Sequence, residues 1–133
     1  MDDPTAPDPE KAREQRGRAM YASQFGVDES QVERTLTGIV GARMAAEAII
    51  AAGGEAWHGP QLSDRERSLV VIACLATQGG VDARLRGHLR WARQRGIPFE
   101  AIESALILLS NYAGQPKASV AMELLRAEEE QGT

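Results

Sequence analysis

The sequence contains few cysteine, histidine and aromatic residues. Its 133 residues contain one cysteine, Cys74, two histidines, and two each of tryptophan, tyrosine and phenylalanine. A single thiol excludes an intramolecular disulfide, a C-x-x-C redox pair and a cysteine-rich zinc site. Two histidines also argue against a histidine-rich metal site. We therefore expect no metal and no cofactor, and a core that is mainly aliphatic.

Excess positive charge and long apolar runs are missing as well. Aspartate and glutamate outnumber lysine and arginine by 19 to 15, a net charge of −4. This balance argues against nucleic acid or a membrane surface as a partner, because both select basic proteins. The longest strongly apolar run, 69–76, is too short to span a bilayer. The acidic, proline-rich N-terminus lacks the apolar core of a signal peptide, so we expect a cytoplasmic protein.

Hydrophobic periodicity and capping residues predict an all-α chain of about six helices. Asp8, Asp28 and Asp82 are the expected caps of three of them. We predict a disordered lead over residues 1–8, a single domain over 9–127 and an acidic tail over 128–133. The predicted helices cover approximately residues 9–24, 28–53, 63–78, 82–96, 99–113 and 116–127.

Two of these predicted helices contain residues that disfavour a regular helix. The run 69–76 is rich in β-branched residues and is also compatible with a buried strand, but the capping box formed by Ser63 and Glu66 favours a helix. Inside the second helix, Gly38 and Gly41 each weaken helical propensity. They predict a close helix contact or a bend at that point.

The helices at 63–78 and 99–113 are apolar on nearly every side. A chain of this size can enclose one such helix, whereas two are more easily buried if a subunit interface covers part of them. We therefore expect a homo-oligomer. The alternative is one compact core in which both helices are central. Cys74 lies in the first of them and is expected to be a buried small hydrophobe.

The segment 82–95 is the most basic part of the chain. It carries five arginines against one aspartate, a local charge of +4. On a helical projection Leu85, Leu89 and Ala92 form an apolar stripe with arginines on both sides. One side carries Arg86, Arg90 and Arg93. The other carries Arg84, His88, Trp91 and Arg95, with His88 nearest the stripe.

His88 is the candidate proton carrier. Burial beside an apolar surface and nearby arginines lower the pKa of a histidine, so we expect His88 to be neutral at pH 7 and able to accept or deliver a proton. The arginines can hold an anionic substrate by charge-assisted hydrogen bonds. The alternative readings are a structural or solvated histidine, arginines that pair with neighbouring acids, and a helix-turn-helix. The net negative charge and the two-sided arginines argue against the last.

The chain contains an ordered set of short motifs: Arg16-Gly17, Gly26-Val27-Asp28, Trp57-x-x-Pro60-x-Leu62, Ser63-x-Arg65-x-Arg67-Ser68-Leu69, Leu85-x-x-His88 and Tyr112-Ala113-Gly114-x-Pro116. The order of these motifs resembles the carboxymuconolactone decarboxylase family over residues 16–125. The resemblance implies an all-α homo-oligomer, a trimer or hexamer. It also implies a lyase that removes CO2 from 4-carboxymuconolactone without a cofactor, in the breakdown of aromatic compounds.

The resemblance also implies roles for individual residues. His88 matches the family histidine and is the expected catalytic proton donor. The expected partners are a small anionic substrate and other copies of the chain. Arg67, Trp57 and Tyr112 match family positions, Ser68 stands where many members have glutamate, and Arg84 lies beside His88. The expected substrate-binding residues are thus Arg67, Arg84, Trp57, Tyr112 and Ser68.

Departures from the family patterns bear on the activity. Related peroxidases carry C-x-x-C-x-x-x-His, but Val81 and Arg84 stand at the two cysteine positions here, which excludes disulfide peroxidase chemistry. Gly59 and Ser68 replace a usual arginine and a usual glutamate. These replacements leave two alternatives open: a different enzyme acting on a small oxo-acid or lactone, and a non-catalytic oligomeric paralogue.

Overall fold

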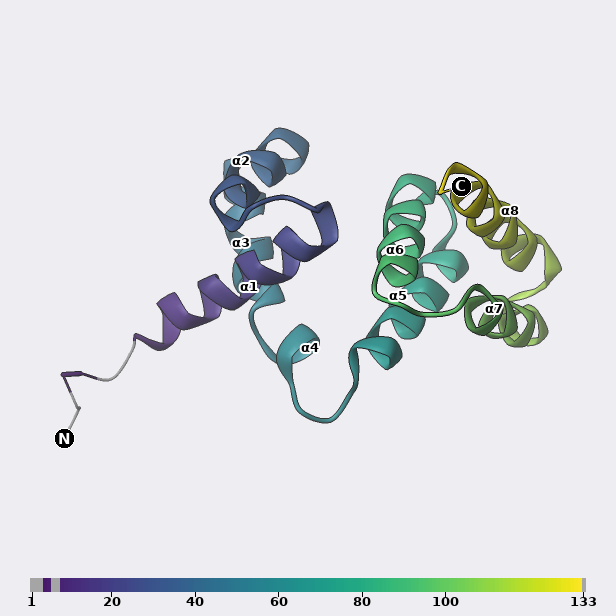
Figure 1. The fold of residues 1–133 in the computed structure, drawn as a ribbon, viewed down its shortest axis with the longest axis horizontal. Helices are drawn as coiled ribbons and strands as arrows, with labels where there is room; N and C mark the ends of the chain where they lie inside the picture. The colour runs from purple at the N-terminus through teal and green to yellow at the C-terminus, as the bar shows by residue number, and fades with distance from the viewer. Residues whose placement is uncertain (1–3, 6–7, 133) are drawn as a thin grey trace. The chain divides into compact units, whose positions relative to one another are not determined.

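The computed structural model describes residues 4–5 and 8–132, and every regular element among them is a helix (Figure 1). The all-α prediction is therefore confirmed. Of the predicted disordered lead, residues 1–3 and 6–7 lie outside the described residues. None of the described helices is long and apolar enough to cross a membrane. The helices are α1 (Pro9–Phe25), α2 (Glu29–Val40), α3 (Ala42–Ala52), α4 (Glu55–His58), α5 (Asp64–Gln78), α6 (Asp82–Gln94), α7 (Phe99–Ala113) and α8 (Gln115–Gln131).

Most of the predicted helix starts are confirmed. The carboxylates of Asp8 and Asp28 each accept a hydrogen bond from the backbone N–H two residues ahead, at 3.0 and 2.9 Å. Ser63 and Glu66 form the expected reciprocal capping box, with bonds of 2.8 and 3.1 Å. The predicted cap of α6 is wrong: Asp82 is the first helical residue, and the capping position has no side-chain hydrogen bond.

The predicted helix over 28–53 is divided in two. Gly41 has a φ of 86°, which glycine adopts far more readily than other residues, and it separates α2 from α3. The bend expected at Gly38 and Gly41 thus falls at Gly41. The segment between the predicted helices 28–53 and 63–78 contains the short helix α4. These two changes account for the eight helices in the described part of the chain, where about six were expected.

The contacts divide the chain into two compact units, residues 1–61 and 62–133. In the first unit, α2 and α3 enclose a small apolar cluster of Val32, Leu36, Ala45 and Ile49. Helix α1 packs very closely on α3, because a Cβ at Gly17 would lie 1.8 Å from the carbonyl oxygen of Ile49. Only glycine allows this approach of the two backbones.

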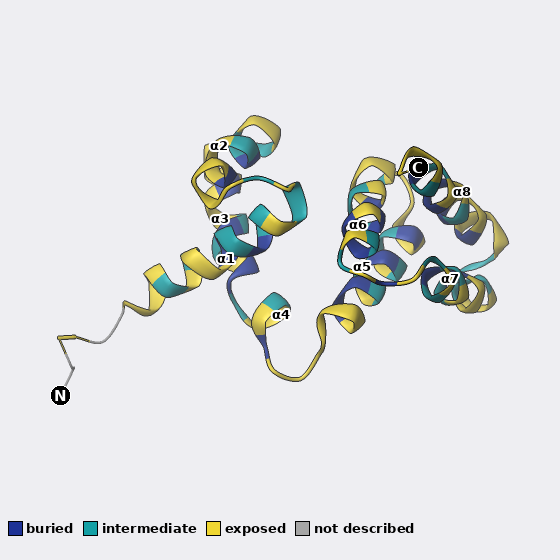
Figure 2. Cartoon of the chain, viewed as in Figure 1, coloured by how far each residue is buried: buried dark blue, intermediate teal, exposed yellow. Residues whose placement is uncertain are grey.

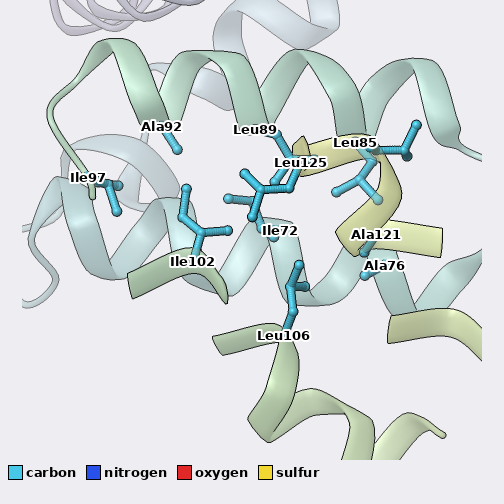
Figure 3. Close-up of a cluster of buried hydrophobic side chains, with 11 residues drawn as sticks. Ile72, Ala76, Leu85, Leu89, Ala92, Ile97, Ile102, Leu106, Ala121 and Leu125 are labelled. Carbon is cyan, nitrogen blue, oxygen red and sulfur yellow. The ribbon is translucent and has the colours of Figure 1, made fainter. Parts of the chain in front are cut away.

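The second unit contains α5 to α8 and the larger core. In Figure 3, Leu85, Leu89 and Ala92 point from α6 towards Ile72 of α5 and Leu125 of α8. This arrangement confirms the predicted apolar stripe of α6. Burying a leucine or isoleucine side chain contributes about 1.5–3 kcal/mol. The stripe therefore fixes the rotation of α6 and decides which residues lie on its two flanks.

Helix α8 continues to Gln131, beyond residue 127, where the domain is predicted to end. The side chain of Glu128 is only 5% exposed and accepts two hydrogen bonds from Arg90, at 3.0 and 3.1 Å. Arg86 lies 3.5 Å from the same carboxylate. Residues 128–131 are thus part of a packed helix, because acidic side chains on α8 face arginines on α6.

Figure 2 shows exposed residues on both α5 and α7, and several of these residues are apolar. Val70 on α5 is exposed, as are Ile107 and Leu108 on α7, and Tyr112 is 86% exposed. The expected burial of Cys74 is wrong, since this residue is exposed too. Cys74 lies one helical turn after Val70, on the side of α5 opposite the core residue Ile72.

Candidate functional site

His88 lies on the middle turns of α6, beside the apolar stripe that anchors this helix. It is half-buried. Burial lowers the pKa of His88 below its ordinary 6.5, and the positive charges of Arg84 and Arg95 lower it further. At pH 7 the imidazole is therefore mainly neutral. The lowered pKa of His88 and the arginines that contribute to it agree with the expectation from the helical projection.

Trp91 and Arg95 extend the site along the same flank of α6. The ring centroids of His88 and Trp91 are 6.0 Å apart and the rings are inclined by 58°. The guanidinium carbon of Arg95 lies 4.2 Å from the Trp91 centroid, which is a cation–π contact. Trp91 is itself buried. A fixed aromatic ring therefore lies between the candidate proton carrier and a cation.

Arg95 connects this flank to the start of α5. One of its terminal nitrogens, Nη1, donates to the hydroxyl of Ser68 at 3.2 Å. The other, Nη2, lies 3.0 Å from a carboxylate oxygen of Asp64. Ser68 is only 2% exposed. The structure thus brings a predicted site residue of α5, Ser68, onto the same arginine that stacks on Trp91.

The two predicted arginines occupy different positions. Arg84 is exposed at the start of α6, and its charge reaches His88. Arg67 is buried, and its Nη1 donates to the backbone carbonyl of Leu62. Arg67 therefore holds the segment that leads into α5. Arg84 is the one of these two whose charge acts on the candidate proton carrier.

Two further predicted residues lie elsewhere in the fold. Trp57 is half-buried on α4, in the first unit, whereas His88 belongs to the second. Tyr112 lies at the exposed end of α7. Their roles beside His88 stay predictions.

Two further residues belong to the site. Arg95 is one of the arginines that were expected to hold an anionic substrate, whereas Asp64 was not predicted. Arg95 had a visible signal, because it lies seven positions after His88 and four after Trp91, a spacing that puts all three on one helix flank. Asp64 had no comparable signal. Its contact with Arg95 joins two different helices, and its position in the sequence indicates only the first turn of a helix.

The opposite flank of α6 has a different set of partners. Arg90 binds Glu128, and Arg93 binds Glu129 through two bonds of 2.8 and 2.7 Å. These hydrogen bonds raise the pKa of both arginines. A groove of about 440 Å³ runs along these pairs. On this flank the alternative reading, in which arginines pair with neighbouring acids, is correct.

The side chains on the His88 flank can bind an anion and can transfer a proton. Arginine and serine can donate hydrogen bonds, and the histidine can carry a proton. Within residues 4–5 and 8–132, no three side chains of histidine, cysteine, aspartate or glutamate are grouped so that they could hold a metal ion.

Comparisons with known proteins add one finding. The model of the carboxymuconolactone decarboxylase family matches residues 43–127, which is more than half of the chain. The matched segment begins in α3, includes α5, α6 and α7, and therefore contains His88 and Arg95. No curated protein and no solved structure matches the chain.

Proposed function

The chain belongs to the carboxymuconolactone decarboxylase family, and we propose that it decarboxylates a small anionic lactone, 4-carboxymuconolactone or a relative of it, without a cofactor. The family match alone supports a coarser choice between a decarboxylase-like and an alkylhydroperoxidase-like role. Val81 and Arg84 occupy the positions that the peroxidases fill with cysteine. The observation that carries the proposal is His88, half-buried, with a pKa lowered by burial, Arg84 and Arg95.

The reaction needs an electron sink, and the substrate supplies it. The departing carboxylate is attached to the ring carbon γ to an unsaturated lactone carbonyl. When the C–C bond to this carboxylate breaks, CO2 leaves and the electron pair delocalises into the carbonyl as a dienolate. A proton then adds to the carbon α to the carbonyl and gives the enol-lactone. The protein must hold the carboxylates, stabilise the oxyanion and supply that proton.

We assign the proton to His88. The proton donor is the imidazolium form of His88, which is the minor form at pH 7. Because the pKa of His88 is lowered, this imidazolium is a stronger acid than that of an ordinary histidine, so proton transfer to carbon is favoured. The neutral imidazole left behind is the form that the surroundings of His88 stabilise. Solvent can reprotonate it for the next turnover, because His88 is only half-buried.

The substrate is held by charge and shape. We assign Arg84 to a substrate carboxylate or the developing oxyanion, because its charge acts on His88. Ser68 presents a hydroxyl beside Arg95, and Arg67 is assigned on its family position. Trp57 and Tyr112 are assigned to substrate binding on their family positions alone.

The first test is turnover of 4-carboxymuconolactone by the purified protein, with CO2 and enol-lactone measured together. His88→Ala is expected to lose at least ~100-fold in rate, which is typical of removing a general acid. His58→Gln is the matched control, since it changes the other histidine, on α4, and keeps a hydrogen-bond donor. Equal rates for His88→Ala and the parent would remove His88 from the mechanism. No turnover by the parent would exclude this substrate.

We further propose that the chain forms a homotrimer or homohexamer through α5 and α7. The support is the exposed apolar side chains of Val70, Ile107, Leu108 and Tyr112, which a second copy would cover. Light scattering is expected to give several times 14.4 kDa. Leu108→Glu is expected to lower this mass, whereas Val120→Glu, on α8, is the control. A monomeric parent contradicts the proposal.

A second candidate function is a different enzyme reaction on a small oxo-acid or lactone. Gly59 and Ser68 favour it, because they replace an arginine and a glutamate usual in the family and so change anion binding and proton handling. A non-catalytic paralogue is the remaining alternative. Turnover of a panel of small oxo-acids and lactones separates these two, since only the enzyme shows loss of activity in His88→Ala.

A further inference from the structure

We propose that Arg95 binds the carboxylate of the substrate, and that Asp64 occupies Arg95 as an internal counter-ion until the substrate displaces it. This inference rests on the proposed function, because it gives a role to residues of the same site. It selects Arg95 among the arginines expected to hold an anion, and it adds Asp64 to the site as a determinant of affinity for anions.

Arg95 is already held in the geometry that carboxylate binding requires. Its guanidinium carbon lies over the ring of Trp91, 4.2 Å from the ring centroid, and its side chain is only 17% exposed. Nη1 is directed to the Ser68 hydroxyl and Nη2 to Asp64. Because the side chain is already ordered, little further conformational entropy is lost when an anion binds.

Asp64 has the properties of a ligand that can leave. Its side chain is 74% exposed, and one of its oxygens, Oδ1, lies 3.0 Å from Arg95. Ion pairs this open to water contribute little to stability. Asp64 is also the first residue of α5, where a carboxylate is favoured by the unpaired backbone N–H groups of the helix. Once released from Arg95, it keeps that favourable place.

The opposite flank of α6 contains a buried ion pair with which the Arg95–Asp64 pair can be compared. Glu128 is 5% exposed and binds Arg90 through both oxygens. A substrate carboxylate could take the place of Glu128 on Arg90 only by displacing a buried glutamate that is bonded through both oxygens. On the His88 flank it needs to displace only an exposed aspartate, so the counter-ion of Arg95 is the easier one to replace.

The position of Arg95 relative to His88 suits the reaction. Trp91 contacts both residues, with 6.0 Å between its ring and that of His88. The charge of Arg95 reaches the imidazole, since it is among the causes of the lowered pKa of His88. A carboxylate held by Arg95 therefore lies on the same helix flank as the proton donor.

The test measures binding of a probe that cannot react. The probe is 5-oxotetrahydrofuran-2-carboxylate, a saturated lactone acid that lacks the double bond needed for loss of CO2, and its primary amide is the neutral control. Calorimetric titration of the full chain at low salt gives the Kd. Asp64→Asn is expected to lower the Kd of the acid by about 2- to 5-fold, the range that exposed ion pairs allow, and to leave that of the amide unchanged.

Matched variants separate local competition from general charge. Asp82→Asn removes the same charge from the first residue of α6 and is expected to leave the Kd within ~1.5-fold of the parent. Arg95→Gln is expected to raise the Kd of the acid at least ~10-fold. Arg95→Lys keeps the charge without the planar fork and is expected to give an intermediate value. Circular dichroism of each variant checks that it is folded.

Three results would overturn the inference: equal effects of Asp64→Asn and Asp82→Asn, unchanged binding in Arg95→Gln, or no binding of the acid by the parent and Asp64→Asn. Failure of the proposed function has a different signature. If 4-carboxymuconolactone is not turned over but Asp64→Asn still tightens binding of the probe, the carboxylate site stands and the reaction is wrong. Turnover with no difference between the two aspartate variants overturns the role of Asp64 alone.

Discussion

Both flanks of α6 carry arginines, but the arginines of the two flanks have different partners. On one flank, Arg90 and Arg93 are bound through both carboxylate oxygens of glutamates on α8. On the other, Arg95 is stacked on Trp91 and paired with an exposed aspartate, and His88 lies two turns away. The first flank fixes one helix to another. The second keeps a cation and a proton carrier accessible.

This difference shows that the local charge of +4 is not in itself a binding site. What distinguishes Arg90 from Arg95 is the burial of the acidic partner. Glu128 is buried and shared by Arg86 and Arg90, so most of the charge on that flank is neutralised within the fold. The partner of Arg95 is open to water, so this charge remains available to a ligand.

The largest expected effect is on activity. If the His88 flank alone holds the substrate, Arg95→Gln should lower kcat/KM for 4-carboxymuconolactone by ~10- to 100-fold, the loss typical of a charge-assisted hydrogen bond to a carboxylate. Arg86→Gln should leave it within ~2-fold, because Arg86 faces α8 and Glu128 retains its bonds to Arg90. Steady-state kinetics of both variants checks the comparison. Comparable losses in both would mean that the two flanks are not functionally distinct.

The next effect is on stability and concerns the other flank. Glu128→Ala removes the acceptor of two Arg90 bonds and the partner of Arg86. Because both arginines are half-exposed and can return to water, the expected loss is about 1–2 kcal/mol in the free energy of unfolding. Urea denaturation gives this value. Glu123→Ala, at an exposed position of the same helix, is the control, and an equal loss there would show that the pairs contribute nothing specific.

Much of the fold follows from local signals that the sequence contains. The Ser63–Glu66 capping box and the apolar stripe through Leu89 each depend on residues close together in the chain, and both were predicted. The break at Gly41 was predicted only as a bend, because two glycines competed for it. Burial of Cys74 was predicted wrongly, since an apolar run does not reveal which side of its helix the other helices cover.

The site was predictable to the extent that it lies on one helix. The spacing of His88, Trp91 and Arg95 on α6 placed them together, and it anticipated the direction of the pKa shift. The contacts that α6 makes with Asp64 and Glu128 were not predictable. They depend on the angles at which α5 and α8 pack against α6, and these angles are set by the whole core rather than by any local pattern.

The smallest expected effect is the pH dependence that His88 adds to stability. Its pKa is below 6.5 in the folded chain, chiefly through burial, and near 6.5 in the unfolded chain. The unfolded chain therefore binds more protons in this window, so stability falls as the pH drops from above 6.5 towards the folded pKa. In His88→Gln this part of the decline should be absent. Urea unfolding of parent and variant at matched pH values measures it as a difference in slope, in which the carboxylates common to both cancel. Identical slopes would mean that His88 is as solvated as the exposed arginines of the other flank, and the contrast between the two flanks would then rest on Arg95 alone.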